Sequence, residues 1–169
     1  MRGYGAFLVG AVVSLTLAHP NGPLERMSEA ATVARMTSSG DGIELEYVGE
    51  DGSTATETIP LYRAGTIRYF SAGMGLDERA AQYPPFPLKL IFVAGTKAYL
   101  TRVSVTIEEA KSALRLQIPG EQVTGPWLFV DLPDGRYKIT ATRGDQTQMK
   151  DHVEVAKGRV KTVYLRWKD

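Results

Sequence analysis

The chain of 169 residues contains no cysteine. Without a thiol, a protein cannot form disulfides, thiolate zinc sites or iron–sulfur clusters, and it has no thiol nucleophile. Histidine is also scarce, since only His19 and His152 are present. The sequence therefore excludes cysteine-dependent chemistry and leaves few ligands for any other metal centre, and we expect no bound cofactor.

The chain also lacks an excess of charge of either sign, because 20 lysines and arginines stand against 19 acidic residues. No stretch resembles the basic runs that bind nucleic-acid phosphates, so we expect no nucleic-acid partner. Hydrophobic residues make up 43% of the chain and charged residues 23%, which is typical of a folded soluble protein. At this length the chain forms one domain, or one small domain with an extended arm.

The longest uncharged stretch, residues 6–18, lies near the amino terminus and follows a single arginine, Arg2. It is too short to cross a bilayer as a helix, but it has the length of the apolar region of a secretory signal peptide. We therefore predict a signal peptide over residues 1–18, with cleavage after Ala18, and a periplasmic or secreted protein that does not span the membrane after cleavage. A retained apolar tail is the alternative.

The remainder of the amino-terminal half divides into a polar linker over residues 19–40 and a β-arm with one short helix over residues 41–86. Ile43, Leu45 and Tyr47 alternate with glutamates, which is the pattern of a half-buried strand. Acidic residues follow the Gly73-Met74-Gly75 turn, and two prolines follow Tyr83, so we expect a helix of at most two turns between them.

Residues 87–169 predict a β-sandwich. Short alternating segments recur with turn residues between them, and no helical segment long enough for a crossover lies among them. This pattern predicts an all-β fold with seven antiparallel strands. The predicted inward-facing residues include one long set on a single strand, namely Tyr99, Thr101, Val103, Val105 and Ile107.

Residues 125–141 read GPWLFVDLPDGRYKITA. A strand that ends in Leu-Pro-x-Gly-x-Tyr and is followed by an alternating strand resembles the carboxypeptidase regulatory-like domain, a prealbumin-like (transthyretin-like) β-sandwich. Residues 70–83 also resemble a segment of exported bacterial proteins that carry this domain. The resemblance implies a binding or accessory role and brings no catalytic residues with it.

Four residues are candidates for partner or ligand contact. Trp127 and Phe129 alternate with Leu128 and Val130, so they lie on the opposite face of their strand, either exposed or covered by residues 73–87. We expect the covered arrangement, whereas an exposed pair would suit sugar stacking. Gly73 and Gly75 suit either a tight turn, which we expect, or an anion site on backbone amides.

Other polar clusters give weaker signals. His152 and Glu154 would share one face of a strand, but two ligands are too few for a metal ion, so a solvated strand face is expected. No Gly-x-Ser-x-Gly motif is present, and a small hydrolase would depend on His152 alone.

The sequence therefore favours a non-catalytic, exported binding or accessory protein of the bacterial envelope, with an envelope protein or a polysaccharide as its partner. A carbohydrate-binding module is the main alternative.

Overall fold

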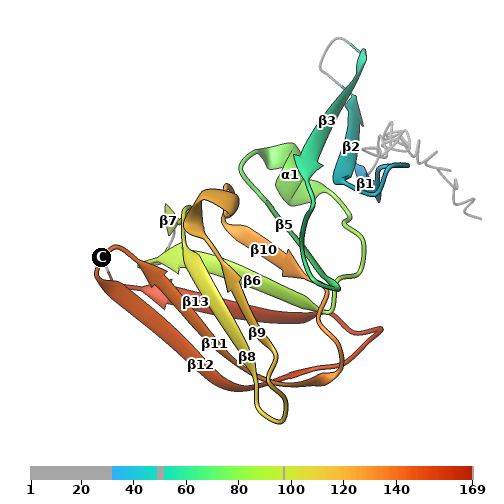
Figure 1. The fold of residues 1–169 in the computed structure, drawn as a ribbon. Coiled ribbons are helices and arrows are strands. Elements are labelled where there is room, and N and C mark those ends of the chain that lie inside the picture. The colour runs from blue at the N-terminus through green and yellow to red at the C-terminus, as the bar shows by residue number, and fades with distance from the viewer. Residues whose placement is uncertain (1–31, 49–51, 97, 169) are drawn as a thin grey trace, which may run out of the picture.

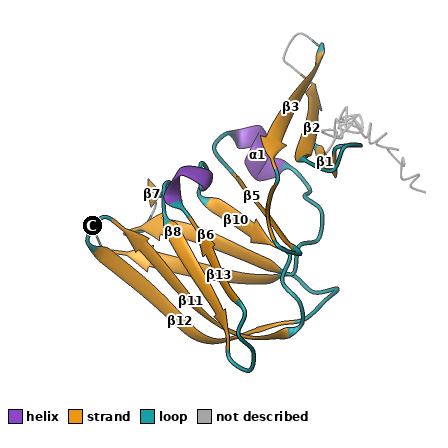
Figure 2. Cartoon of the chain, viewed as in Figure 1, coloured by secondary structure: helices purple, strands orange, loops and turns teal. Residues whose placement is uncertain are grey.

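The computed structural model describes residues 32–48, 52–96 and 98–168. These residues are mostly β, with 58% of them in strands and 6% in helices, which confirms the all-β prediction. Three sheets and one short α-helix make up the fold (Figures 1 and 2). The predicted signal peptide, residues 1–18, and most of the predicted linker lie outside the described residues.

Two of the sheets form the sandwich. The first has four strands in the order β12-β11-β8-β9, all antiparallel. The second has six strands, in the order β13-β6-β10-β5-β4 with β7 paired to β6. The four-stranded sheet comprises β8 (Ser104–Glu109), β9 (Arg115–Ile118), β11 (Gly135–Arg143) and β12 (Gln146–Val155). The six-stranded sheet comprises β4 (Tyr62–Ala64), β5 (Ile67–Ala72), β6 (Leu88–Ala94), β7 (Ala98–Tyr99), β10 (Trp127–Val130) and β13 (Lys161–Trp167).

The prediction that every strand is antiparallel is wrong at one pair. Strand β13 runs parallel to β6, with Lys161 opposite Leu88 and Trp167 opposite Ala94. A parallel pair needs a crossover connection, which is usually a helix. Here the chain between β6 and β13 enters the four-stranded sheet twice, as β8–β9 and as β11–β12, so the opposite sheet supplies the crossover without a long helix.

The long strand predicted from Tyr99 to Ile107 is divided into β7 and β8, which lie in different sheets. The break falls at Arg102, whose φ of 57° is left-handed and unusual for a residue with a side chain. The backbone there is closely packed, because a Cβ on Gly120 would lie 2.8 Å from the Arg102 carbonyl oxygen. The alternating pattern continued across the break and concealed it.

The third sheet has the order β1-β2-β3 and is antiparallel throughout. Its strands are β1 (Val33–Met36), β2 (Gly42–Val48) and β3 (Thr54–Pro60). Strand β1 lies within the segment predicted as a linker, where its pairing with β2 places the buried Ala34 against the arm. The range predicted as an arm is divided, because β4 and β5 belong to the sandwich sheet.

The short helix α1 (Leu76–Ala80) begins where the sequence predicts but ends earlier. Backbone bonds explain the early end, since Ala34 donates to the Gln82 carbonyl and Gln82 donates to the Thr32 carbonyl. The chain therefore leaves the helix to pair with the segment around β1. A single 3₁₀ turn, η1 (Gly120–Gln122), precedes β10.

The six-stranded sheet separates two hydrophobic clusters. Its inner face and the four-stranded sheet enclose the sandwich core, which contains Leu90, Phe92, Leu128 and Ile139. Its outer face meets the three-stranded sheet over a second cluster, whose buried members are Ala34, Ile43, Leu45, Ile59, Leu61, Phe70, Ala72, Phe86 and Phe129. In Figure 1 the β2–β3 hairpin extends from this junction away from the sandwich.

Candidate functional site

Phe129 lies on the outer face of β10, as its alternation predicts, and it is buried with 5% of its surface exposed. Its ring stacks on that of Phe70 with the centroids 4.6 Å apart, and the Tyr83 ring lies 4.9 Å away. Tyr83 and Phe86 come from residues 73–87, so the expectation that this segment covers Phe129 is confirmed. Phe129 is therefore not available for sugar stacking.

Trp127 lies in the same outer row but is only half-buried. The Lys89 Nζ atom lies 3.4 Å from the centroid of its ring, and a Cβ on Gly73 would approach its Cδ2 atom to 3.0 Å. The indole Nε1 is buried and has no hydrogen-bond partner among the described residues. Burial lowers the pKa of the Lys89 ammonium, and the electron-rich ring stabilises its positive charge.

The Gly73-Met74-Gly75 turn binds a carboxylate from its own chain. The Glu78 Oε2 atom accepts hydrogen bonds from the Gly73 amide at 2.6 Å and the Met74 amide at 3.3 Å. Gly73 has a φ of 96°, which a residue without a Cβ adopts readily, and Gly75 is the residue before α1. The turn is therefore structural, and Glu78 occupies the amides that an external anion would need. Of the four predicted residues, Gly73, Trp127 and Phe129 lie together, whereas Gly75 is exposed beside them.

On the remaining part of the outer face, the outward-facing residues of β13 are exposed, whereas on β6 Lys89 is half-buried and Ile91 and Val93 are buried. We define the open half-face as Lys89, Thr162, Tyr164 and Arg166, which point away from the sandwich core because their strand neighbours fill it. Tyr164 is 56% exposed and lies opposite Ile91, which in turn lies opposite Trp127. A cross-strand row thus leads from the half-buried tryptophan to an exposed tyrosine.

Positive charge predominates at and beside the open half-face. Arg166 donates to the Gly95 carbonyl, and the Arg79 guanidinium lies 5.5 Å from the centroid of the Tyr99 ring, which is 50% exposed. None of the ion pairs between described side chains involves Lys89, Arg79 or Arg166. Lys89, Arg79 and Arg166 therefore lack an acidic partner among the described side chains, and Arg79 lies beside an exposed ring.

The sequence analysis did not single out this surface, although it contained the signals. Tyr164 alternates with Val163 and Leu165, so its outward direction follows from the same rule that placed Trp127. Lys89 is the one charged residue of the apolar strand β6. Which strands the arm leaves uncovered is a tertiary property, and no local pattern encodes it.

His152 is exposed and lies at a β-bulge of β12. The register between β11 and β12 shifts between Tyr137 and Ile139, and His152 has a φ of 56°. Glu154 is engaged by Arg136, whose Nη2 atom lies 2.7 Å from its Oε1 atom. No group of three potential ligands among His, Asp and Glu forms in the described part of the chain.

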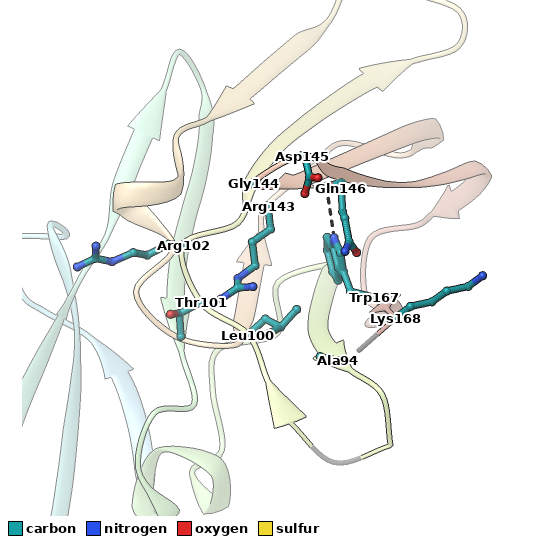
Figure 3. Close-up of a pocket in the computed structure, with 10 residues that line it drawn as sticks. All are labelled: Ala94, Leu100, Thr101, Arg102, Arg143, Gly144, Asp145, Gln146, Trp167 and Lys168. Carbon is teal, nitrogen blue, oxygen red and sulfur yellow. Dashed lines mark hydrogen bonds between the residues drawn. The ribbon is translucent and has the colours of Figure 1, made fainter.

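A polar cavity of about 450 Å³ opens at one end of the sandwich, with Trp167, Leu100 and Ala94 at its apolar side (Figure 3). The Trp167 indole donates to the Gln146 carbonyl at 3.4 Å. In Figure 3 the Arg143 side chain extends toward Thr101, whereas the side chains of Arg102 and Lys168 point away from it. The basic groups around this cavity therefore do not converge on one point.

In the part of the chain that the structure describes, neither helical segment has the length and apolar composition needed to span a bilayer. Comparisons with protein-family models, with characterised proteins and with solved structures give no match to this chain.

Proposed function

We propose that the protein is a non-catalytic, exported binding or accessory protein of the bacterial envelope, and that it binds an acidic envelope component through the open half-face. The observation that carries the proposal is Lys89, a half-buried cation held against Trp127 without an acidic partner among the described residues. Placing a cation there costs solvation energy that an acidic ligand would offset.

Tyr164 and Tyr99 supply the second element of the proposed surface. Each presents about half of its surface, 56% and 50%, beside the basic side chains. Amphipathic rings provide contact area with few rotatable bonds, and cations next to them favour acidic groups on the partner. A polysaccharide with carboxylate groups suits this combination, and an acidic protein segment is the other partner of matching charge.

We also propose the prealbumin-like fold and the carboxypeptidase regulatory-like family. Residues 87–169 contain eight strands, with β8, β9, β11 and β12 in one sheet and β6, β10, β13 and the two-residue β7 in the other. Within Leu-Pro-x-Gly-x-Tyr, the Tyr137 hydroxyl donates to the Pro133 carbonyl at 2.8 Å, and a Cβ on Gly135 would lie 3.2 Å from the tyrosine ring. The spacing of the motif thus allows the tyrosine to bond back to the turn that precedes its own strand, which supports the resemblance.

Export belongs to the proposal as well. The apolar stretch of residues 6–18 carries this part. Analysis of the amino terminus of the protein recovered from the cell envelope tests it. A new terminus at or near His19 is the expected result, and an intact Met1 on the mature protein contradicts it.

Calorimetric titration tests the binding proposal with three polymers, namely polygalacturonate, polyglutamate and neutral dextran. We expect a saturable, salt-sensitive signal with polygalacturonate, weakened at least about tenfold by Lys89→Met, because one charge contact is worth about 1.4 kcal/mol or more in a desolvated setting. Lys138→Met is the matched control, since Lys138 is exposed on the other sheet. Equal losses in both variants would contradict the proposed surface.

A carbohydrate-binding module is the second candidate, and the exposed rings of Tyr164 and Tyr99 favour it. This differs from the sequence-based hypothesis of an exposed Trp127–Phe129 face, because Phe129 is buried. Binding of neutral dextran that Tyr164→Ala abolishes and Lys89→Met leaves unchanged would favour this candidate over acidic recognition. Binding of polyglutamate alone would favour a protein partner.

A further inference from the structure

Among the strands that the structure describes, β3 is an edge strand with fewer protective features than the other edges have. It pairs with β2 over its full seven residues, Thr54 to Pro60, without a register shift. It contains no lysine or arginine and no bulge, and Pro60 lies at its end. Long regular edges with free backbone groups pair readily with another strand.

The other edges are short, irregular or charged. Strands β1, β4 and β9 have three or four residues each, and β1 is bridged to Gln82. Strand β12 has ten residues, but it carries the bulge near His152 and also Lys150. Strand β13 carries Lys161 and Arg166. These features discourage edge pairing, so β3 stands apart among the described strands.

The backbone groups on the edge of β3 that pairs with no other described strand can be identified. The Leu61 amide donates to the Asp41 carbonyl, so Leu61 directs its backbone groups toward β2. Because successive residues of a strand alternate, Ala55, Glu57 and Ile59 also face β2. Thr54, Thr56 and Thr58 therefore present their amides and carbonyls outward, and Pro60, which has no amide, occupies the next outward position.

We propose that β3 pairs with β3 of a second copy of this chain, antiparallel and with a two-fold axis at Thr56. In this register Thr56 faces Thr56 of the other copy and Thr54 faces Thr58. The three outward amides and three outward carbonyls of the threonines in each copy therefore all form hydrogen bonds. Threonines lie opposite threonines on the solvent-exposed side, which is a favourable cross-strand pairing. Glu57 lies opposite Ala55 rather than opposite another acid.

Charge and shape both permit this pairing. Glu44 and Glu46 lie on β2, so they are about 14 Å from their counterparts across three strand spacings, beyond the screening length of about 8 Å. The closest like charges are the two Glu57 residues, which are diagonal neighbours about 7–8 Å apart with solvent-exposed side chains. The sandwich lies at the Pro60 end of β3 (Figure 1), so an antiparallel arrangement directs the two sandwiches to opposite ends of the new six-stranded sheet. The inference does not depend on the open half-face.

Disulfide trapping tests the register directly, because the chain has no cysteine of its own. In Thr56→Cys the two Cα atoms would lie about 5.5 Å apart, within the range of about 4.4–6.8 Å that a disulfide needs. In the matched control Thr54→Cys they would lie about 14 Å apart along the strands. We expect mild oxidation to produce the covalent dimer of Thr56→Cys at least ~10 times faster than that of Thr54→Cys. Equal rates, or no dimer from either variant, would overturn the proposal.

Light scattering of the cysteine-free chain, in the form the cell produces, gives an independent measurement. We expect a dimer that dissociates on dilution, and a monomer for Thr56→Lys, which keeps the backbone intact but places two like charges opposite each other. Thr56→Val is the control and should remain dimeric. A chain that is monomeric throughout a concentration series, or a dimer that Thr56→Lys does not weaken, would refute the two-fold pairing.

Discussion

The two faces of the six-stranded sheet are covered by cores of different size and kind. On the inner face, 23 buried residues from both sandwich sheets and their connecting segments form one cluster that is mostly aliphatic. On the outer face, nine buried residues form the second cluster. The six-stranded sheet contributes aromatic rings to it, and the three-stranded sheet contributes Ile43, Leu45 and Ile59. We therefore expect the sandwich to keep its structure without the three-stranded sheet, which we call the arm, and we expect the arm to depend on the sandwich surface beneath it.

The largest predicted effect comes from a substitution in the sandwich core. Phe92 is fully buried and its ring lies 6.3 Å from that of Trp167. Phe92→Ala leaves a large cavity, and we expect a loss of about 3–5 kcal/mol in the free energy of unfolding, measured by denaturant titration. Because the sandwich supports both cores, backbone amides of every sheet should lose hydrogen-exchange protection together. Protection that persists in the arm would contradict this dependence.

The corresponding substitution in the arm should act locally. Ile43 is fully buried in the second cluster, on the arm side. We expect Ile43→Ala to cost about 2–4 kcal/mol, expressed as faster hydrogen exchange in β1, β2 and β3 while β6 and β8 keep their protection. Equal loss of protection in all three sheets would show that the two cores unfold as one unit.

The strands were predicted best from the sequence where one face of the strand is exposed to solvent. Strand β13 has Val163, Leu165 and Trp167 buried and their neighbours exposed, and its alternation was unambiguous. Strand β5 is buried on both faces over Tyr69 to Ala72, so its pattern gave no indication that it belongs to the sandwich. Local periodicity reports the environment of a strand but not the sheet in which it lies.

The candidate site was predictable in part for the same reason. Alternation placed Trp127 and Phe129 on the outer face, and the structure has them there. Which of the two is covered depends on where Tyr83 and the arm lie, and this is fixed by contacts distant in the sequence. The open half-face arises from that placement, so it became visible only in three dimensions.

Alkaline pH should lower the stability of both cores, because each core contains a tyrosine whose pKa is raised. Burial raises the pKa of Tyr83 in the second cluster and of Tyr137 in the sandwich core, with smaller contributions from Glu78 and Glu109, respectively. A raised pKa means that stability is fully present below the ordinary value of 10.0 and is lost as the pH rises above it.

We therefore expect the free energy of unfolding to fall above pH 10, because these tyrosines ionise in the unfolded chain at a pH where burial keeps them neutral in the folded one. Tyr83→Phe should make this decline shallower, and it should cost about 1 kcal/mol at neutral pH through the lost bond to the Glu78 carbonyl. Denaturant titrations across alkaline pH measure both effects. An unchanged slope in Tyr83→Phe would contradict the assignment.

The smallest predicted effect concerns the contact that joins the two regions. Arg68 on β5 binds Asp131 through Nε at 3.0 Å and Nη2 at 2.5 Å, and its Nη1 atom reaches the Met36 sulfur of the arm at 3.5 Å. Both charged side chains are about one-third exposed, so solvent screens the pair. A double-mutant cycle with Arg68→Met and Asp131→Asn should give a coupling of at most about 1 kcal/mol. A coupling several times larger would mean that this pair, rather than apolar packing, holds the arm to the sandwich.

The two tryptophans provide the most direct test, because Trp127 lies beside Lys89 on the outer face and Trp167 is buried in the sandwich core. Polygalacturonate titrated into the single-tryptophan variants Trp167→Phe and Trp127→Phe should change only the emission of Trp127, saturably and in step with the calorimetric binding curve. A response from Trp167 instead, or binding that leaves the Trp127 emission unchanged, would contradict recognition of an acidic partner at the open half-face.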